Sequence, residues 1–301
     1  MRYRNIILLI VILFSFLSFS CQKENKMKEL NYIISEKAPL KKTPMRVVSV
    51  SPAITEIMFY LDCGDRLIGR TEFCNYPSQT KNIQSIGGIN NANLEMIIAL
   101  KPDLVITSSI FTKKMFETIE NASIPIMSFQ ERNSIEGMYE IIEIIGGIMD
   151  KEAKAQEIIN NVKDRLSKIK QEREKNLKTK GVTSLPKVYY VVGFGAGGDF
   201  SAGKDTYIDE IIHLAGGYNI AKESINWSFS KEELFAKQPD FIFVRKEDSA
   251  IFVNTHPYNE LNAVKQNRVF GIESRLMDIQ TPRTIDAIEY ISNIISTASH
   301  L

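Results

Sequence analysis

Two stretches of the chain carry the same residue pattern, and this repeat constrains the fold more than any other feature. The segments NLEMIIALKPDLVI and KEELFAKQPDFIFV align on Pro102 and Pro239, each followed by an aspartate. The same offset relates Glu95 to Glu232. Each copy has the pattern of a helix, a proline turn and a buried strand, so the repeat predicts two lobes of like design.

Alternating strand and helix patterns surround both copies. From Met45, the segment MRVVSVSP is an apolar, β-branched run that ends at Ser51-Pro52, and AITEIMFYLDCG has helical spacing after it. A proline at the first helical position favours a helix start there. Such alternation builds parallel sheets covered by helices, so we predict the α/β class, with an N-terminal lobe over residues 45–149.

A long charged stretch separates the two halves. Residues 150–177 contain no Gly or Pro, and their apolar residues recur at steps of three and four. This spacing predicts one helix, about 40 Å long at about 1.5 Å per residue, with a single apolar stripe. We expect it to be a rigid bridge between the first lobe and a second α/β lobe over residues 178–301.

The N-terminus has the layout of a secretory signal. Arg2 and Arg4 precede an apolar run that ends on small residues before Cys21. We therefore expect residues 1–20 to be a signal peptide and Cys21 to carry lipid, although Ser18 stands where such signals usually have leucine. An uncleaved N-terminal anchor is the alternative. Either way, the folded part is expected outside the cytoplasm, at the outer face of the membrane or in the periplasm.

The region after Cys21 is polar and rich in lysine. Its composition predicts that residues 21–44 form a solvated spacer between the anchor and the first lobe. Over the whole chain the formal net charge is only +1. This balance does not indicate a nucleic-acid partner.

Two further cysteines, Cys63 and Cys74, lie close together in the sequence. In an exported chain they could form a disulfide. Two free thiols are an equal alternative, because spacing alone does not establish the geometry that a disulfide needs.

One glycine-rich segment, GFGAGGDFSAGKD, matches two phosphate-loop patterns between Gly193 and Lys204. No helix can begin directly after Gly198, and Asp205 stands where a magnesium-binding Ser or Thr is required. We expect a loop that lines a cleft. The three scattered histidines predict no metal site, and no Ser, Cys or His pattern indicates a nucleophile, so we expect neither a cofactor nor an enzyme.

Aromatic and cationic residues gather at predicted strand ends and loops. In open α/β sheets, ligands bind outside the carboxyl ends of the strands. Flat apolar faces with guanidinium groups suit a large planar ligand that carries anionic groups. The candidates are Phe73, Phe129, Phe194, Phe200, Trp227, Arg245, Arg275 and Arg283.

The segments RVVSVSPAITEIMFYLDCGDRLIGRTEFCNYP, NLEMIIALKPDLVITSS and GKDTYIDEIIHLAGGYNIA resemble the class III substrate-binding proteins of ABC importers. The likeness extends from Met45 to Ile295, with its motifs in order. It implies two α/β lobes bridged by one rigid helix, a monomer, and capture of cobalamin, a ferric siderophore or haem for a membrane-spanning permease.

In that family one glutamate on each lobe meets arginines of the permease, and the positions that match here are Glu95 and Glu232. The cobalamin-binding branch carries aromatic residues in the loops that match Phe73, Phe200 and Trp227. It also carries a tryptophan before the motif NLE, where this chain has GGINNA, and an acid where this chain has Arg275. These departures leave the ligand open between a corrinoid and an iron chelate, with Arg275 favouring the chelate.

Two functions are therefore carried forward. The first is a lipid-anchored receptor with Phe73, Phe200, Trp227, Arg275 and Arg283 at its ligand site. The alternative is an exported, nucleotide-dependent enzyme that uses the Gly193–Lys204 loop. Binding of cobalamin, haem or siderophore, against binding of NAD or ATP, separates the two.

Overall fold

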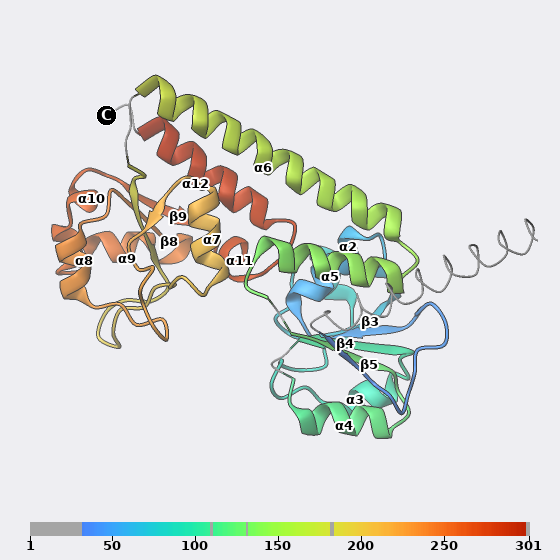
Figure 1. Ribbon diagram of the computed structural model, residues 1–301. Helices are drawn as coiled ribbons and strands as arrows, with labels where there is room; N and C mark the ends of the chain where they lie inside the picture. Colours follow the sequence, from blue (N-terminus) through green and yellow to red (C-terminus); the bar gives the residue numbers. More distant parts are fainter. Residues whose placement is uncertain (1–31, 109–110, 131, 181–183, 299–301) are drawn as a thin grey trace, which may run out of the picture.

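A computed structural model describes residues 32–108, 111–130, 132–180 and 184–298 (Figure 1). The expected signal peptide and Cys21 lie outside these residues. The described part forms two α/β lobes joined by a long helix, which confirms the predicted fold class. None of the helices described is both long enough and apolar enough to cross a membrane.

The N-terminal lobe is built on a five-stranded sheet in the order β1-β5-β4-β2-β3. All its pairings are parallel except that of β1 with β5, which is antiparallel. Its strands are β1 (Tyr32–Ile34), β2 (Val47–Ser49), β3 (Leu67–Arg70), β4 (Leu104–Ser108) and β5 (Ile126–Phe129). Its helices are α2 (Pro52–Tyr60), α3 (Leu94–Ala99), α4 (Lys113–Asn121) and α5 (Ile135–Ile148).

The C-terminal lobe has a four-stranded, parallel sheet in the order β7-β6-β8-β9. Its strands are β6 (Lys187–Val191), β7 (Tyr218–Asn219), β8 (Phe241–Arg245) and β9 (Val269–Ile272). Its helices are α7 (Tyr207–Leu214), α8 (Lys231–Lys237), α9 (Ser249–Asn254), α10 (Asn262–Lys265), α11 (Ser274–Asp278) and α12 (Thr284–Ala298).

The bridging helix α6 runs from Glu152 to Lys180 and packs against two helices, α5 and α12. The C-terminal helix α12 lies beside it (Figure 1), where Arg165 of α6 donates to Glu289 and Asp286 of α12 at 2.5 to 2.7 Å. One cluster of buried apolar side chains includes residues of both sheets and of α5, α6, α7 and α12. The lobes therefore share a core, which makes their connection stiff.

The Pro-Asp repeat has the same structural role in both lobes. The residues before the prolines, Lys101 and Gln238, both have left-handed backbones, with φ of 49° and 42°. Asp103 then accepts hydrogen bonds from the backbone N–H groups of Met45 and Arg46, at 2.8 to 3.1 Å. Asp240 accepts one from Lys187 at 2.7 Å. Each aspartate thus fastens the start of the neighbouring strand of its sheet.

The polar segment before residue 45 is not wholly a spacer. Tyr32–Ile34 pairs with β5 at the edge of the first sheet, and the Tyr32 ring lies 6.0 Å from that of Phe129. Ser35 and Ala38 are buried behind it. The predicted boundary at residue 45 is corrected to include Tyr32–Ile34, because this short apolar triplet inside a lysine-rich stretch adds an edge strand to the sheet.

Candidate functional site

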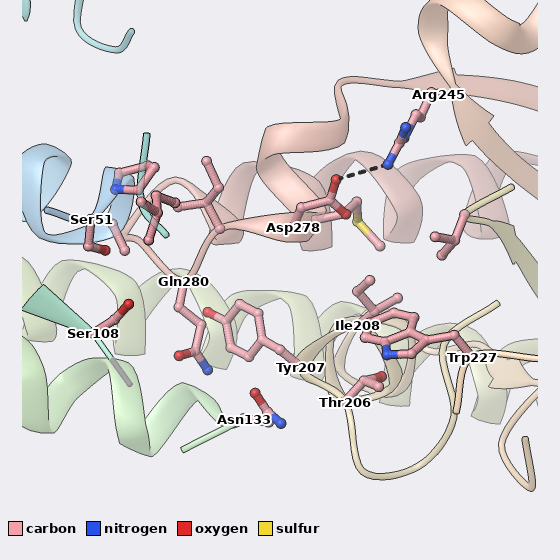
Figure 2. A pocket seen from close by; sticks show the side chains of 16 residues that line it. Ser51, Ser108, Asn133, Thr206, Tyr207, Ile208, Trp227, Arg245, Asp278 and Gln280 are labelled. Atoms are coloured by element: carbon pink, nitrogen blue, oxygen red, sulfur yellow. Dashed lines mark ion pairs between the residues drawn. The ribbon is translucent and has the colours of Figure 1, made fainter. Parts of the chain in front are cut away.

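A cavity of about 510 Å³ lies between the lobes (Figure 2). The elements that form it end at the cavity: Ser51 follows β2, Ser108 ends β4, Val192 follows β6 and Arg245 ends β8. These positions are the carboxyl ends of parallel strands, where α/β sheets bind ligands. The complete lining is Ser51, Pro52, Ala53, Ile89, Ser108, Asn133, Val192, Thr206, Tyr207, Ile208, Trp227, Arg245, Met277, Asp278, Ile279 and Gln280.

Hydrogen bonds join the two lobes beside this cavity. The Asn133 side chain donates to the carbonyl of Asp205 at 3.0 Å, and the Gln280 side chain donates to the carbonyl of Arg132 at 2.7 Å. The backbone N–H of Ile135, at the start of α5, donates to a Glu210 carboxylate oxygen at 2.8 Å. Carboxylates are favoured at helix N-termini. These bonds hold the lobes together at one side of the cleft.

Of the candidate ligand residues, Arg245 and Trp227 line the cavity, and Trp227 is the aromatic one. It lies in the turn Ile225–Ser228, where both central residues have left-handed backbones, with φ of 53° at Asn226 and 66° at Trp227. A bulky residue rarely adopts this conformation, and such strain persists where surrounding contacts enforce it. The Trp227 side chain is 45% exposed and lies along the cavity wall in Figure 2.

Phe200 comes from the glycine-rich loop and lies beside that turn without lining the cavity. Bridges to Gly193 and Ser228 hold its backbone. The loop is anchored from behind, because Tyr258 donates to buried Asp199 and accepts from the backbone N–H of Gly195 at 3.0 Å. The next helix, α7, starts only at Tyr207. This geometry is a packed cleft loop and gives a phosphate no helix N-terminus at the glycines.

Phe73 and Arg275 also lie outside the cavity lining. Phe73 is 54% exposed in the loop after β3, and Arg275 lies half-buried on α11. The sequence patterns missed the polar lining residues Ser51, Ser108, Asn133, Asp278 and Gln280. Two of these, Ser51 and Ser108, could have been found from the sequence, because they lie at the ends of predicted strands.

The ligand contact expected of Arg283 stays a prediction, and the structure places this residue in a buried contact between the lobes. It is 6% exposed, and its Nη1 lies 3.4 Å from Oε1 of buried Glu56 in the other lobe. Its guanidinium also stacks 3.7 Å from the centre of the Tyr76 ring. Burial raises the pKa of Glu56, and the charge of Arg283 opposes that rise. The guanidinium is thus already paired and covered.

The disulfide alternative for Cys63 and Cys74 is corrected. Both cysteines are buried and free. The Cys74 sulfur lies 3.1 Å from the hydroxyls of Thr55 and Thr71, and burial raises the pKa of its thiol. Cys63 packs in the shared core instead.

Within the described residues, no three His, Cys, Asp or Glu side chains lie close enough together to hold a metal ion.

Glu95 and Glu232 are both exposed and occupy the same position, next to the first residue of α3 and of α8. Each helix starts from a side-chain cap, Asn93 and Ser230 respectively.

Comparisons with known proteins agree with this architecture. Residues 47–276 match the family model described as periplasmic binding protein. The substrate-binding lipoprotein YvrC of an ABC transporter in Bacillus subtilis is 28% identical, covering 91% of this chain and 90% of that protein. A vitamin B12-binding protein of Vibrio parahaemolyticus is 26% identical, covering 81% of this chain and 86% of that protein.

A periplasmic haem-binding protein from Pseudomonas aeruginosa has the same fold, with a TM-score of 0.76 at 20% identity, covering 85% of this chain and 94% of that one. The family match extends over most of the chain and includes the bridging helix and most of both lobes. The chain therefore belongs to the periplasmic binding protein family.

Proposed function

We propose that this chain is an exported receptor that captures a corrinoid or an iron complex between its lobes and delivers it to an ABC permease. The observation that carries the proposal is the cavity at the carboxyl ends of both sheets, with Trp227 on its wall. Its volume lies in the range of about 300–1,000 Å³ common for small-molecule sites. The names of the B12-binding and haem-binding relatives support this ligand class.

Delivery is the second part of the proposal. Glu95 and Glu232 lie at matching, exposed helix starts on separate lobes, so they can present two negative charges to arginines of a permease. Charge complementarity of this kind serves orientation and association rate. A lipid on Cys21 would keep the receptor beside its permease, as the name of the lipoprotein YvrC supports.

Capture is tested by isothermal titration calorimetry of the purified chain with cyanocobalamin, haemin and a ferric tris-hydroxamate. We expect at least one of the three ligands to bind with a 1:1 stoichiometry. The variant Trp227→Ala should bind that ligand about tenfold or more weakly, because it loses an aromatic contact that the bound ligand buries. Tyr218→Ala is the matched control, since Tyr218 is a similarly exposed aromatic residue outside the cavity. Heat changes absent for all three ligands would refute the proposal.

Delivery is tested by uptake of the bound ligand in cells that carry the permease. The variant Glu95→Ala/Glu232→Ala loses uptake while its affinity for the ligand stays unchanged. Glu117→Ala on α4, another exposed helical glutamate, keeps uptake. Undiminished uptake by the double variant would contradict the docking role.

A further inference from the structure

The charges that line the cavity are few. Of the 16 described residues that surround it, Arg245 and Asp278 alone carry a charge at neutral pH. The other polar groups are hydroxyls and amides, on Ser51, Ser108, Asn133, Thr206, Tyr207 and Gln280. The wall as a whole is therefore close to electrically neutral.

Arg245 and Asp278 face each other across the C-terminal side of the cavity (Figure 2). Arg245 ends β8, and Asp278 ends α11. Their closest atoms, Nη2 and Oδ2, are 3.7 Å apart, whereas a charge-assisted hydrogen bond measures about 2.7–2.9 Å. Both side chains remain more than a third exposed. The pair thus keeps unused hydrogen-bonding capacity on the side of the ligand.

Two further features concern the hydrogen bonds of Arg245 and Asp278. The Arg245 Nε is buried and has no hydrogen-bond partner among the described residues. The Tyr190 hydroxyl donates to the other Asp278 oxygen at 3.5 Å, near the limit of a hydrogen bond. Since Nε is covered, the exposed part of the guanidinium is the part that a ligand acceptor in the cavity can meet.

Acidic groups lie beside this wall as well. Glu247 lies close enough to Asp278 to add to the rise in the pKa of that carboxyl, which burial causes in the first place. Two exposed cations in cavity-side loops already have acidic partners, Arg132 with Glu140 and Lys204 with Glu223. A ligand with several carboxylates would therefore bury negative charge beside Asp278 with one guanidinium, already paired, to balance it.

We propose that the Arg245–Asp278 pair selects an uncharged ligand that carries carboxamide groups and discriminates against polyanionic ones. A primary carboxamide offers its oxygen to the guanidinium and its N–H to the carboxylate, so it satisfies both partners and adds no net charge. This inference rests on the proposed receptor function and names the ligand chemistry within it. Arg275, which favoured an anionic iron chelate, does not line the cavity.

Calorimetry with a matched ligand pair tests the inference. The pair is cyanocobalamin, which carries carboxamides, and its monocarboxylic acid derivatives, in which one carboxamide is hydrolysed. Haemin, with two carboxylates, is the third probe. The wild-type chain binds cyanocobalamin about tenfold or more tightly than either anionic probe, because each anionic probe loses a hydrogen bond to a charged group and places a carboxylate beside Asp278. Cyanocobalamin binding changes little with salt.

Two variants test the roles of Arg245 and Asp278 separately. Arg245→Gln weakens cyanocobalamin binding by about tenfold. Asp278→Asn removes the negative charge with little change of shape, and it tightens binding of the anionic probes relative to cyanocobalamin. Lys246→Gln is the control, since it removes an exposed positive charge from the neighbouring residue without touching the cavity. Thermal melts establish that all three variants fold.

Two outcomes overturn the inference and are distinguishable from failure of the receptor function. Tighter binding of haemin than of cyanocobalamin by the wild-type chain would leave the receptor intact but refute the selection of uncharged ligands. An Asp278→Asn variant with unchanged relative affinities would refute the role of the pair. If no probe binds the wild-type chain, the receptor proposal fails, and this inference fails with it.

Discussion

Replacing Arg283 with methionine leaves a buried carboxylate without its partner, and the cost should depend on pH. Glu56 is 4% exposed in its side chain, and its Oε2 already has no hydrogen-bond partner within the described structure. Without Arg283 the cheaper response of Glu56 is to take up a proton. Protonation costs about 1.4 kcal/mol for each pH unit above the usual pKa of 4.5. Because burial already raises the pKa of Glu56 in the wild type, the variant loses at most about 3 kcal/mol at pH 7 and about 1 kcal/mol at pH 5 from this cause.

The sign follows from proton linkage. In the Arg283→Met variant the pKa of Glu56 is higher in the folded than in the unfolded chain, so stability is full below about pH 4.5 and is lost as pH rises towards the folded pKa. Urea unfolding of both proteins at pH 7 and pH 5 measures the difference. The variant Arg283→Met/Glu56→Gln recovers stability at pH 7, since the uncharged amide removes the buried charge. A cost that is equal at both pH values would refute this reasoning.

Three other predictions concern stability alone. Arg165 holds the pKa of Glu289 below its usual 4.5, so Glu289→Gln lowers the free energy of unfolding in urea at pH 7, by about 1 kcal/mol or less for this partly exposed pair, and lowers it less at about pH 3. An equal loss at both pH values would contradict the contribution of this ion pair. Tyr258→Phe leaves buried Asp199 without a donor and costs about 1–3 kcal/mol in a thermal melt; no shift would contradict the anchoring of its loop. Gly203→Ala places Cβ 2.3 Å from the Ser224 carbonyl and lowers the melting temperature, whereas Gly147→Ala in α5 meets nothing within 4 Å and does not.

The sequence was sufficient for the architecture because its strongest signals are local and repeated. The Pro-Asp pairs predicted two copies of one unit, and each aspartate does fasten a strand. The apolar stripe predicted the bridging helix within a few residues of its bounds. It did not predict that α12 lies beside that helix, because the pairing depends on contacts between segments far apart in the chain.

The candidate site was predicted less well for the same reason. Trp227 was found because an aromatic residue in a loop is a visible signal, but Phe73 shared that signal and does not line the cavity. Arg283 looked like a ligand residue, since nothing local shows that Glu56 of the other lobe would neutralise it. Lining residues such as Gln280 reach the cavity only through the way the lobes pack, which no local pattern encodes.

Capture of a ligand between the lobes can be followed by the intrinsic fluorescence of the chain. Trp227 is the only tryptophan and lies on the cavity wall, so its emission reports on the cleft without a label. We expect cyanocobalamin to change this emission saturably at a 1:1 ratio, while NAD and ATP leave it unchanged. A response to NAD or ATP, with none to cyanocobalamin, haemin or a ferric tris-hydroxamate, would contradict the proposed capture.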